Sequence, residues 1–450
     1  MVFTLEIGII ALALASIIAA VFPSTSNSAA LLFLVSLAAG LVGIHLVAFH
    51  FRWQMIPVFV VIGFLLVKLL LGWEAGRAAG FIGAGVGILF LATSTVLSLG
   101  LPVRTLPAPD GPGKAGVVTI NREYIPDSDA DGDPAQIRRL QLKVWYPAAI
   151  EDGKEFGRET VWSEFNSAEY FSAIERFFTA YLKNMKTHSF LSPPMAVGGT
   201  DRPVLIYNHA LLSIASDSFL LMESLASHGY VIIAIRHKDQ RGEYALLHDD
   251  LSDEEKAKEV ENFKKLGGKD LERDERSAVS LQVYRDNNTL PVIVKRRAKD
   301  TGFVLDNLDS ILKDIPGCTE GRCADNQRIG IVGLSLGGAV ATEFCKADPR
   351  CAAAVNLDGG IFGTNIEVPV QVPYLMLYSE RNEGGNDFAK TGADETYEDY
   401  TISGAEHLNF ADASVVLPGL RYIRLLGSID GEHMNRERNL LVRDFLDRQL

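Results

Sequence analysis

The stretch IVGLSLGGAV, residues 331–340, places Ser335 between Gly333 and Gly337 in the pattern Gly-x-Ser-x-Gly. An apolar run, 328–332, precedes the serine and a helical pattern follows it. This is the strand–turn–helix context of a nucleophile elbow. Small neighbours are needed there because the tight turn strains the serine backbone and leaves no room for side chains. We therefore predict that Ser335 is a nucleophile rather than a serine in an ordinary Gly-rich turn.

A serine hydroxyl becomes a good nucleophile only when a base removes its proton. His407 lies in TISGAEHLNFAD, in the turn after a late strand-like run. A histidine there completes the chain order Ser, Asp, His that α/β-hydrolases use. His209 follows an early strand and is expected to shape the oxyanion turn, and His433 lies in a charged helical segment and is expected at the surface. We predict that His407 is the base.

Two carboxylates are candidates for the acid that orients this histidine. Asp358 ends the apolar run 351–358, and Glu380 ends the next run, 373–380. Both positions are carboxyl ends of strands, where ligand chemistry collects in parallel sheets. Either carboxylate would orient the histidine and stabilise its charged form if buried against it. The residue pattern leaves both open.

The oxyanion of an acyl-transfer reaction needs two backbone N–H donors. We expect the first from Leu336, directly after the nucleophile, and the second from Leu211, in the turn after the apolar run 203–210. Because these roles belong to the backbone, the side-chain types carry little information about them.

An aspartate-rich stretch, DSDADGD at 127–133, resembles the beginning of a calcium loop. The twelfth position of such a loop is Arg138, where calcium needs a bidentate glutamate. No helical pattern flanks the stretch, so a solvated turn between two strands is favoured. We therefore predict no metal ion and no cofactor.

The four cysteines all follow residue 317, and two of them flank the short loop CTEGRC. Cys318 and Cys323 would close this loop as a disulfide in an oxidising compartment, or they are free thiols. Both interpretations stay open. Zinc is disfavoured because no Cys-x-x-Cys pair or nearby histidine accompanies them.

Short apolar runs alternate with helical stretches through the chain after residue 115. The strand-like runs are 116–125, 140–147, 203–210, 230–237, 328–335, 351–358 and 373–380, and the helical stretches are 216–228, 292–315 and 337–346. Such alternation predicts an α/β fold, a mostly parallel sheet covered by helices on both faces. The highly charged segment 240–290 breaks the rhythm as an insertion. It either caps or borders an active site or is a solvated helical excursion.

The beginning of the chain has a different composition. Four apolar runs cover about 5–22, 29–49, 55–71 and 79–97. Each approaches the roughly 20 residues that a helix needs to cross a bilayer. Glu6 and Lys68 are the charges within them, and both can reach the headgroups. We predict a region of about four transmembrane helices at 1–99, a Pro/Gly-rich linker at 100–115 and a hydrolase domain at 116–450. Buried helices of a soluble domain are the disfavoured alternative, since soluble helices keep a polar face.

Charge separates these parts further. The chain carries a net charge of −13, with +1 in residues 1–103 and −14 in the remainder. The acidic remainder has no basic patch, so we expect no nucleic-acid partner. Basic residues at the span ends (Arg52, Arg104 and Lys114 against Lys68 and Arg77) weakly favour a cytoplasmic hydrolase domain. A disulfide would favour the opposite side, so the side stays open.

Several segments together resemble the platelet-activating factor acetylhydrolase family, the lipoprotein-associated phospholipase A2 type. They are WYPA, RPVLIYNHALL, ESLASHGYVIIAIRHKD, GLSLGGAV, NLDGG and HLNFAD, and they occur in the family's order through most of 116–412. The membrane region is not part of this resemblance. The chain has Ala210 where the family usually has glycine.

The resemblance implies an α/β-hydrolase with a triad of Ser335, His407 and Asp358, which selects Asp358 over Glu380. It also implies oxyanion donors at Leu211 and Leu336. Family members cleave short or oxidised acyl groups from phospholipids, or other small esters, without calcium.

We therefore expect a membrane-anchored serine carboxylic ester hydrolase that acts on lipid or phospholipid acyl esters. The alternatives are an acyltransferase, or a hydrolase of small esters, polyesters or amides, on the same fold. A non-enzymatic membrane receptor or scaffold is disfavoured by the complete set of catalytic residue types. The expected partners are an ester or lipid substrate and the bilayer, and the oligomeric state is left open.

Overall fold

The structure is a computed structural model that divides the chain into two compact units. It describes residues 2–22, 25–49, 51–73, 76–126, 137–150, 154–167, 171–196, 201–237, 251–266, 271–318, 323–364, 366, 368–390 and 396–450. The helical unit comprises 1–106, 160–187 and 417–419, and the α/β unit comprises 107–159, 188–416 and 420–450. The aspartate-rich stretch 127–133 lies outside the described residues, as does 240–250, the start of the charged insertion.

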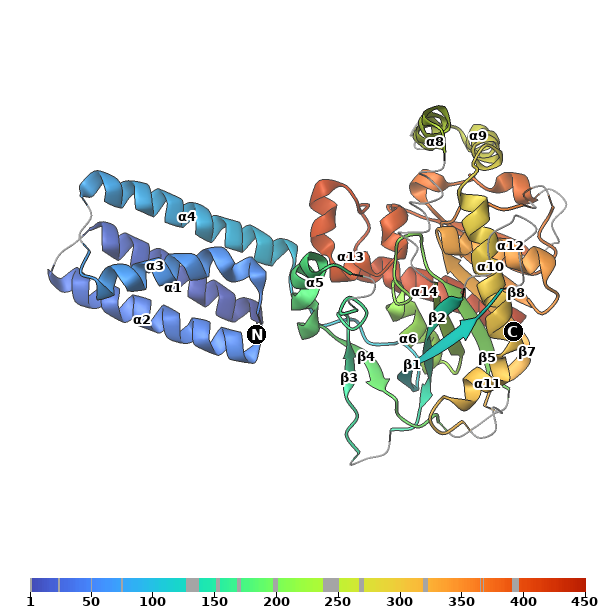
Figure 1. The fold of residues 1–450 in the computed structure, drawn as a ribbon, viewed down its shortest axis with the longest axis horizontal. Helices are drawn as coiled ribbons and strands as arrows, with labels where there is room; N and C mark the ends of the chain where they lie inside the picture. Colours follow the sequence, from blue (N-terminus) through green and yellow to red (C-terminus); the bar gives the residue numbers. More distant parts are fainter. Residues whose placement is uncertain are drawn as a thin grey trace. The chain divides into compact units, whose positions relative to one another are not determined.

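The helical unit contains four long apolar helices (Figure 1). They are α1 (Val2–Val21), α2 (Thr25–Ala48), α3 (Ile56–Leu70), which follows the short η1 (Trp53–Met55), and α4 (Arg77–Gly100). Each helical span is long and apolar enough to cross a membrane, and 22–33% of its most apolar window is buried inside the protein. Their outward surfaces are apolar as well, for example at Ile18 and Phe33. Helices that are apolar all round fit lipid or a large core rather than water.

The helical unit also takes in a segment that the sequence prediction placed within 116–450. Residues 160–187 include α5 (Ala173–Thr179) and η2 (Ala180–Asn184). The Trp53 indole Nε1–H donates to the carbonyl oxygen of Phe178 at 2.8 Å, and the two rings pack edge to face. Contacts between residues more than a hundred positions apart therefore build this part of the unit.

Ten described strands form one sheet in the order β10-β9-β8-β7-β5-β6-β2-β1-β4-β3. Neighbours from β10 to β6 are parallel, and β2 is antiparallel to both β6 and β1. In chain order the strands are β1 (Lys114–Tyr124), β2 (Arg138–Ala148), β3 (Arg158–Thr160), β4 (Lys186–Leu191), β5 (Pro203–Asn208), β6 (Val231–Arg236), β7 (Asp325–Leu334), β8 (Ala353–Leu357), β9 (Tyr374–Ser379) and β10 (Tyr397–Ile402). The predicted α/β fold with a mostly parallel sheet is confirmed.

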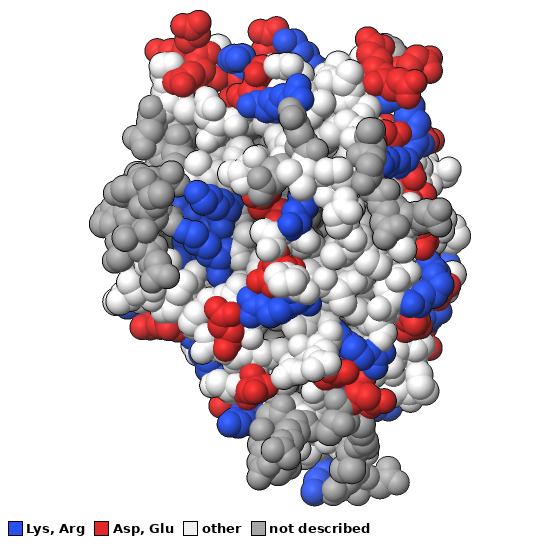
Figure 2. Space-filling model, turned by 90° about the vertical axis from the view of Figure 1, so that its right-hand side faces the viewer, with Lys and Arg blue, Asp and Glu red and all other residues white. Residues whose placement is uncertain are grey.

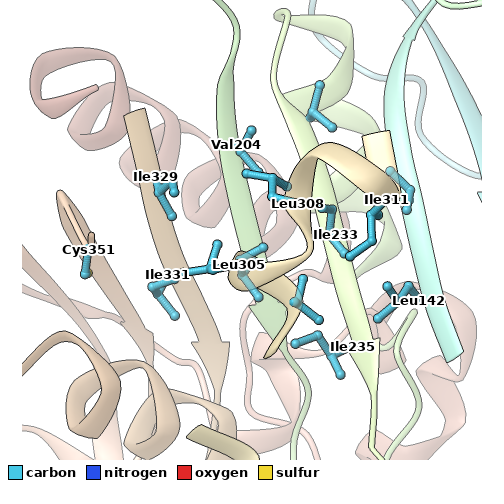
Figure 3. Close-up of a cluster of buried hydrophobic side chains, with 14 of the residues drawn as sticks. Leu142, Val204, Ile233, Ile235, Leu305, Leu308, Ile311, Ile329, Ile331 and Cys351 are labelled. Carbon is cyan, nitrogen blue, oxygen red and sulfur yellow. The ribbon is translucent and has the colours of Figure 1, made fainter. Parts of the chain in front are cut away.

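Helices cover the sheet on both faces because its central strands are apolar on both sides. On β7, Ile329 and Ile331 join a core cluster with residues of α10 (Leu290–Asp306) and α11 (Leu308–Lys313), as Figure 3 shows. Gly330, between them, faces the other way, because a Cβ atom there would lie 3.5 Å from Leu446 of α14 (Gly431–Gln449). Two helical layers therefore sandwich the sheet.

The remaining helices follow the expected alternation. The described ones are α6 (Phe219–Ser227), α8 (Asp253–Leu266), α9 (Arg273–Arg285), α12 (Leu336–Ala347), α13 (Ala413–Val416), and the short η3 (Glu380–Asn382), η4 (Asp387–Lys390), η5 (His407–Phe410) and η6 (Pro418–Ile423). The helical stretch expected at 292–315 is two helices, since α10 ends at Asp306 and α11 begins at Leu308.

Surface charge is mixed on the face of the molecule drawn in Figure 2. Basic side chains lie there in small groups beside acidic ones. Binding to a nucleic-acid backbone needs basic side chains gathered along one surface. Among its described residues, this face therefore lacks the continuous basic stripe of a nucleic-acid interface.

Candidate active site

Ser335 occupies a strained turn between β7 and α12. Its backbone has φ 56° and ψ −119°, a conformation that L-residues rarely adopt. The flanking glycines leave no space for a side chain. A Cβ atom on Gly333 would lie 1.9 Å from the carbonyl oxygen of Gly337, and one on Gly337 would lie 1.9 Å from that of Asn208. The Gly-x-Ser-x-Gly pattern is therefore explained by close backbone packing.

Three side chains from separate loops form a hydrogen-bonded row at this turn. The Oγ atom of Ser335 lies 2.9 Å from Nε2 of His407. Nδ1 of the same ring lies 2.7 Å from Oδ2 of Asp358. Asp358 directly follows β8, and His407 begins η5 after β10. A serine, a histidine and a carboxylate in this arrangement have the geometry that proton transfer from a nucleophilic serine requires.

Asp358 is buried and held by further donors. Its Oδ1 accepts the backbone N–H of Ser379 at 2.6 Å, and its Oδ2 accepts the Asn382 side-chain amide at 2.8 Å. Glu380, the other candidate acid, is exposed and accepts the N–H of Gly404 at 3.1 Å. The structure therefore brings Asp358 to His407, whereas the carboxylate of Glu380 makes no hydrogen bond to that ring.

The environment of His407 favours its charged form. Burial lowers the pKa of His407, but the hydrogen bond from the ring to Asp358 and the negative charges of Asp358 and Glu406 outweigh burial, so the pKa is raised. An imidazole that has taken up a proton is thereby stabilised. This is the property that a general base needs while a tetrahedral intermediate exists.

The two residues expected to supply oxyanion donors, Leu211 and Leu336, line the same cavity as Ser335. Leu336 is the first residue of α12, so its N–H has no partner within the helix. Leu211 lies in the turn after β5, and the hydrogen bonds of the described residues leave its N–H without an acceptor. Ala210 is accommodated in this turn, and its N–H donates to Oδ2 of Asp217 at 3.1 Å.

The cavity beside Ser335 has a volume of about 490 Å³ and is partly built by the charged insertion. Its described lining from α8, α9 and the start of α10 consists of Leu266, Arg276, Ser280, Tyr284 and Leu290. The sequence left open whether this insertion borders the active site or extends into solvent. In the structure, its described helices line the cavity.

One arginine attaches α9 beside this cavity. The guanidinium of Arg273 is hydrogen-bonded to Asp387, and it lies 3.0 Å from Glu383 and 2.7 Å from Asp399. The N–H of Phe388 also donates to the Ser277 hydroxyl at 2.9 Å. These contacts join the insertion to the segments that follow β9 and fix the wall of the cavity.

Two other histidines have the surroundings that the sequence suggested. His209 is buried, and its Nδ1 lies 2.8 Å from the carbonyl oxygen of Ala210 in the turn after β5. Burial and the neighbouring charge of Arg297 hold the pKa of His209 well below its usual range. His433 is exposed on α14, 3.6 Å from Glu437. Among the described residues, no three His, Cys, Asp or Glu side chains are grouped to hold a metal ion.

The four cysteines form two disulfides, both in the α/β unit. Cys318 pairs with Cys323, which is one of the two alternatives that the sequence left open. Cys345 pairs with Cys351, a pairing that the sequence analysis did not consider. The second pair joins the end of α12 to the loop before β8.

Sequence reasoning missed several residues around the site. Asn382 holds Asp358, and Arg276 and Tyr284 line the cavity. A second group lies on α10, where Arg297, Asp300 and Thr301 are fully buried polar residues. Their spacing of three and four residues on an otherwise apolar helical face was a signal that the sequence offered.

Comparison with known proteins agrees with this architecture. Residues 129–450 match the family model described as "Platelet-activating factor acetylhydrolase, isoform II". The platelet-activating factor acetylhydrolase of Cavia porcellus is 23% identical over 348 residues, covering 73% of this chain and 74% of that protein. The Bos taurus protein of the same name is 24% identical over 294 residues, covering 60% and 62%, so the chain spans less than two thirds of its length.

A solved structure of a ferulic acid esterase from Streptomyces cinnamoneus has a TM-score of 0.55 with this chain at 21% identity. The match covers 78% of this chain and 94% of that one. At this identity the likeness is evidence for the fold alone, which is that of an α/β-hydrolase preceded here by four apolar helices.

Proposed function

The chain belongs to the platelet-activating factor acetylhydrolase isoform II family and is a carboxylic ester hydrolase, and we propose that it is a membrane-anchored serine enzyme acting on lipid acyl esters. The observation that carries the proposal is the hydrogen-bonded row from Ser335 through His407 to Asp358. In this proposal Ser335 is the nucleophile, His407 the general base and acid, and Asp358 the residue that orients the ring.

The reaction begins when Oγ of Ser335 attacks the ester carbonyl carbon while Nε2 of His407 takes the hydroxyl proton. The carbonyl oxygen becomes an oxyanion that the N–H groups of Leu211 and Leu336 stabilise. Collapse of this intermediate breaks the ester C–O bond, and His407 gives its proton to the leaving alcohol. A water molecule then attacks the acyl-enzyme with His407 again as base, which releases the acid and restores Ser335.

The cavity lining supports an ester with both an apolar and a polar part. Leu211, Leu266, Leu290 and Phe362 offer apolar surface to an acyl chain. Arg276 and Arg381 also line the cavity and offer positive charge to the polar part of the substrate. At about 490 Å³ the cavity has the size of an ordinary small-molecule site, which favours a short acyl group over a full-length chain.

The four helices of the helical unit anchor the enzyme in a bilayer, supported by their length and their apolar outward surfaces. The α/β unit faces an oxidising compartment outside the cytoplasm, supported by its two disulfides. Labelling intact cells with a membrane-impermeant maleimide tests this orientation. We expect labelling of the α/β unit only after a reductant has been added, and labelling that requires permeabilised cells would contradict the outward orientation.

The nucleophile is tested with a fluorophosphonate probe and a panel of esters and phospholipids on purified full-length protein. We expect the probe to label the wild type and the Ser310→Ala control, whose serine is exposed on α11, but not Ser335→Ala. Hydrolysis should release free acid and vanish in Ser335→Ala. Equal labelling of both variants would refute Ser335, and transfer of the acyl group to an added alcohol in preference to water would favour an acyltransferase.

A further inference from the structure

Four side chains form a hydrogen-bonded series that we name the buried column: the partly buried Arg138 and the buried Asp300, His237 and Asn208. We propose that the buried column positions the second oxyanion donor, the N–H of Leu211, relative to Ser335. This inference rests on the proposed function, since it assigns positioning residues to the same reaction. The residues that line the cavity do not include any member of the column, so its members act through the loop and not on the substrate.

Asn208 is the point at which the column meets the active site. It is the last residue of β5, pairs with Gly333 of β7, and leads directly into the turn that carries Leu211. Its carbonyl oxygen lies so close to Gly337 that a Cβ atom there would come within 1.9 Å. A displacement of Asn208 would therefore change the distance between the nucleophile turn and the Leu211 N–H.

His237, directly after β6, holds the side chain of Asn208. Its Nε2 lies 3.0 Å from the Asn208 amide, and its Nδ1 lies 2.7 Å from Oδ2 of Asp300. Burial lowers the pKa of His237 to about 4, so the ring is neutral at neutral pH. Oδ1 is the Asn208 atom that faces Nε2 in the structure, but a neutral ring that donates from Nδ1 to Asp300 accepts at Nε2. We therefore infer that the amide is turned, with its nitrogen toward the ring.

The same amide orientation suits the neighbouring hydroxyl. The amide atom that faces His237 also lies 3.2 Å from Oγ1 of Thr301, and that hydroxyl is 3.1 Å from the carbonyl oxygen of Arg297. The hydroxyl thus donates to the carbonyl and accepts from the Asn208 nitrogen. One tautomer and one amide orientation satisfy these two contacts together, while the other amide atom of Asn208 is buried without a hydrogen-bond partner among the described residues.

Asp300 anchors the other end of the column. Its carboxylate accepts from the Tyr124 hydroxyl at 2.6 Å, from Nε and Nη2 of Arg138 at 2.6 Å each, and from His237. These donors come from the end of β1, the beginning of β2 and the residue after β6. The column therefore ties three strands and α10 to the end of β5.

A second contact from α10 reaches the oxyanion turn itself. Arg297, one helical turn before Asp300 and Thr301, donates from Nη1 to the carbonyl oxygen of His209 at 2.8 Å. The helix is in turn packed on the sheet through Leu305, and through Leu308 and Ile311 of the following α11 (Figure 3). A rigid support of this kind keeps an oxyanion donor oriented before the reaction begins, which is how such donors accelerate acyl transfer.

A matched pair of substitutions at His237 tests the column. The amide nitrogen of asparagine can replace the donor Nδ1 of a histidine, and the amide oxygen of glutamine can replace the acceptor Nε2, so His237→Asn keeps the Asp300 contact and His237→Gln keeps the Asn208 contact. We expect His237→Asn to lower kcat about 10- to 100-fold, less than the 10²- to 10³-fold loss of a whole oxyanion donor. Its KM should stay within about twofold, since the cavity is unchanged. His237→Gln should retain most of kcat.

A trifluoromethyl ketone, which forms a tetrahedral oxyanion adduct with the nucleophile, distinguishes positioning of the oxyanion donor from a merely structural role. We expect its inhibition constant to rise in His237→Asn by the same factor as kcat/KM falls. His433→Asn on the surface serves as the control and should change neither quantity. The proposal would be overturned if His237→Asn had the kcat and the ketone inhibition of the wild type. It would also be overturned if His237→Gln lost as much kcat as His237→Asn.

Thr301→Val, which removes the hydroxyl contacts to Asn208 and to the carbonyl oxygen of Arg297, takes the place of His237→Asn if that variant does not fold. We expect a several-fold loss of kcat with the same parallel change in ketone inhibition, and an unchanged kcat would overturn the proposal. Failure of the proposed function has a different signature. In that case the fluorophosphonate probe and the ketone do not inhibit even the wild type, whereas failure of the column leaves the wild type inhibited through Ser335.

Discussion

The helical unit and the α/β unit each bury a carboxylate among basic side chains, but among the described residues only the one in the α/β unit has hydrogen-bond partners for both of its oxygens. In the α/β unit, the carboxylate of Asp300 receives four hydrogen bonds from Tyr124, Arg138 and His237. In the helical unit, Glu6 lies 3.1 Å from Arg52 and 3.2 Å from His45. Its second carboxylate oxygen has no hydrogen-bond partner in the described part of the chain.

The shortage in the helical unit extends to the neighbours of Glu6. Nδ1 of His45 and both side-chain amide atoms of Gln54 are also buried without a partner among the described residues. Each such atom costs free energy, because burial removes its water and nothing replaces it. A carboxylate whose two oxygens are both bonded is held in one orientation, whereas the carboxylate of Glu6 is held through one oxygen.

The largest expected effect is at the acid of the triad. Asp358→Asn keeps the shape of the side chain but removes the charge that orients and stabilises the His407 ring. We expect kcat to fall about 10⁴-fold while the protein stays folded, as happens when a triad acid becomes an amide. Steady-state kinetics with a soluble ester, together with a thermal melt, measures both effects.

Glu380→Gln is the matched control for this substitution. Glu380 has the same position at the end of the neighbouring strand, but it is exposed and bonded to Gly404 rather than to His407. We expect kcat within about twofold of the wild type. A severe loss in Glu380→Gln with an active Asp358→Asn would reverse the assignment of the acid.

These two carboxylates also show where sequence reasoning ends. The central strands were predictable, since their apolar runs need burial on both faces, but β3 and β4 were not predicted. The turn at Ser335 was predictable as well, since close backbone packing leaves room only for glycine on either side of it. Asp358 and Glu380 were indistinguishable from residue pattern alone, because both follow buried strands. Only the donors from Ser379 and Asn382, brought in by the fold, distinguish them.

The contacts that the sequence analysis did not predict join residues that lie far apart in the chain. The ion pair of Arg138 with Asp300 joins residues 162 positions apart. The segment 160–187 belongs to the helical unit through contacts such as that of Trp53 with Phe178, 125 positions apart. Local periodicity carries no information about such partners, although the buried polar residues on α10 hinted that partners existed.

The next largest effect is expected at the buried carboxylate of the helical unit, Glu6. Glu6→Gln removes the charge that balances Arg52, which is itself buried. Breaking a buried ion pair from one side costs about 3–5 kcal/mol, so we expect the helical unit to unfold at lower denaturant in detergent. Turnover per folded molecule should be unchanged, since the triad lies in the other unit. Replacing both residues by leucine should cost less than Glu6→Gln alone.

Arg77→Gln provides the control for this experiment, because Arg77 is an exposed residue at the beginning of α4. We expect its stability within about 0.5 kcal/mol of the wild type. If Glu6→Gln were as stable as this control, the cluster of the helical unit would be energetically neutral and the contrast between the two units would disappear.

A smaller effect is expected from the disulfide between Cys345 and Cys351, which joins the end of α12 to the loop before β8. Cys345 and Cys351 are separated by six positions, and closing so short a loop stabilises a protein by about 2 kcal/mol through the unfolded state. We expect the double variant Cys345→Ala/Cys351→Ala to melt several degrees lower while keeping kcat. An unchanged melting temperature in oxidised and reduced protein alike would indicate that the pair is not formed.

The smallest change is a pH dependence, and it distinguishes the two histidines of the α/β unit. Protonated His407 cannot accept the serine proton, so activity is lost as pH falls through its pKa, which lies above the usual value of about 6.5. The pKa of His237 is about 4, so the column stays neutral in this range. We expect log kcat/KM to fall with a slope of one below the His407 pKa, down to about pH 5, in the wild type and in His237→Asn alike. A midpoint below 6.5 would contradict the raised pKa of His407, and a slope of two would mean that His237 takes up a proton together with it.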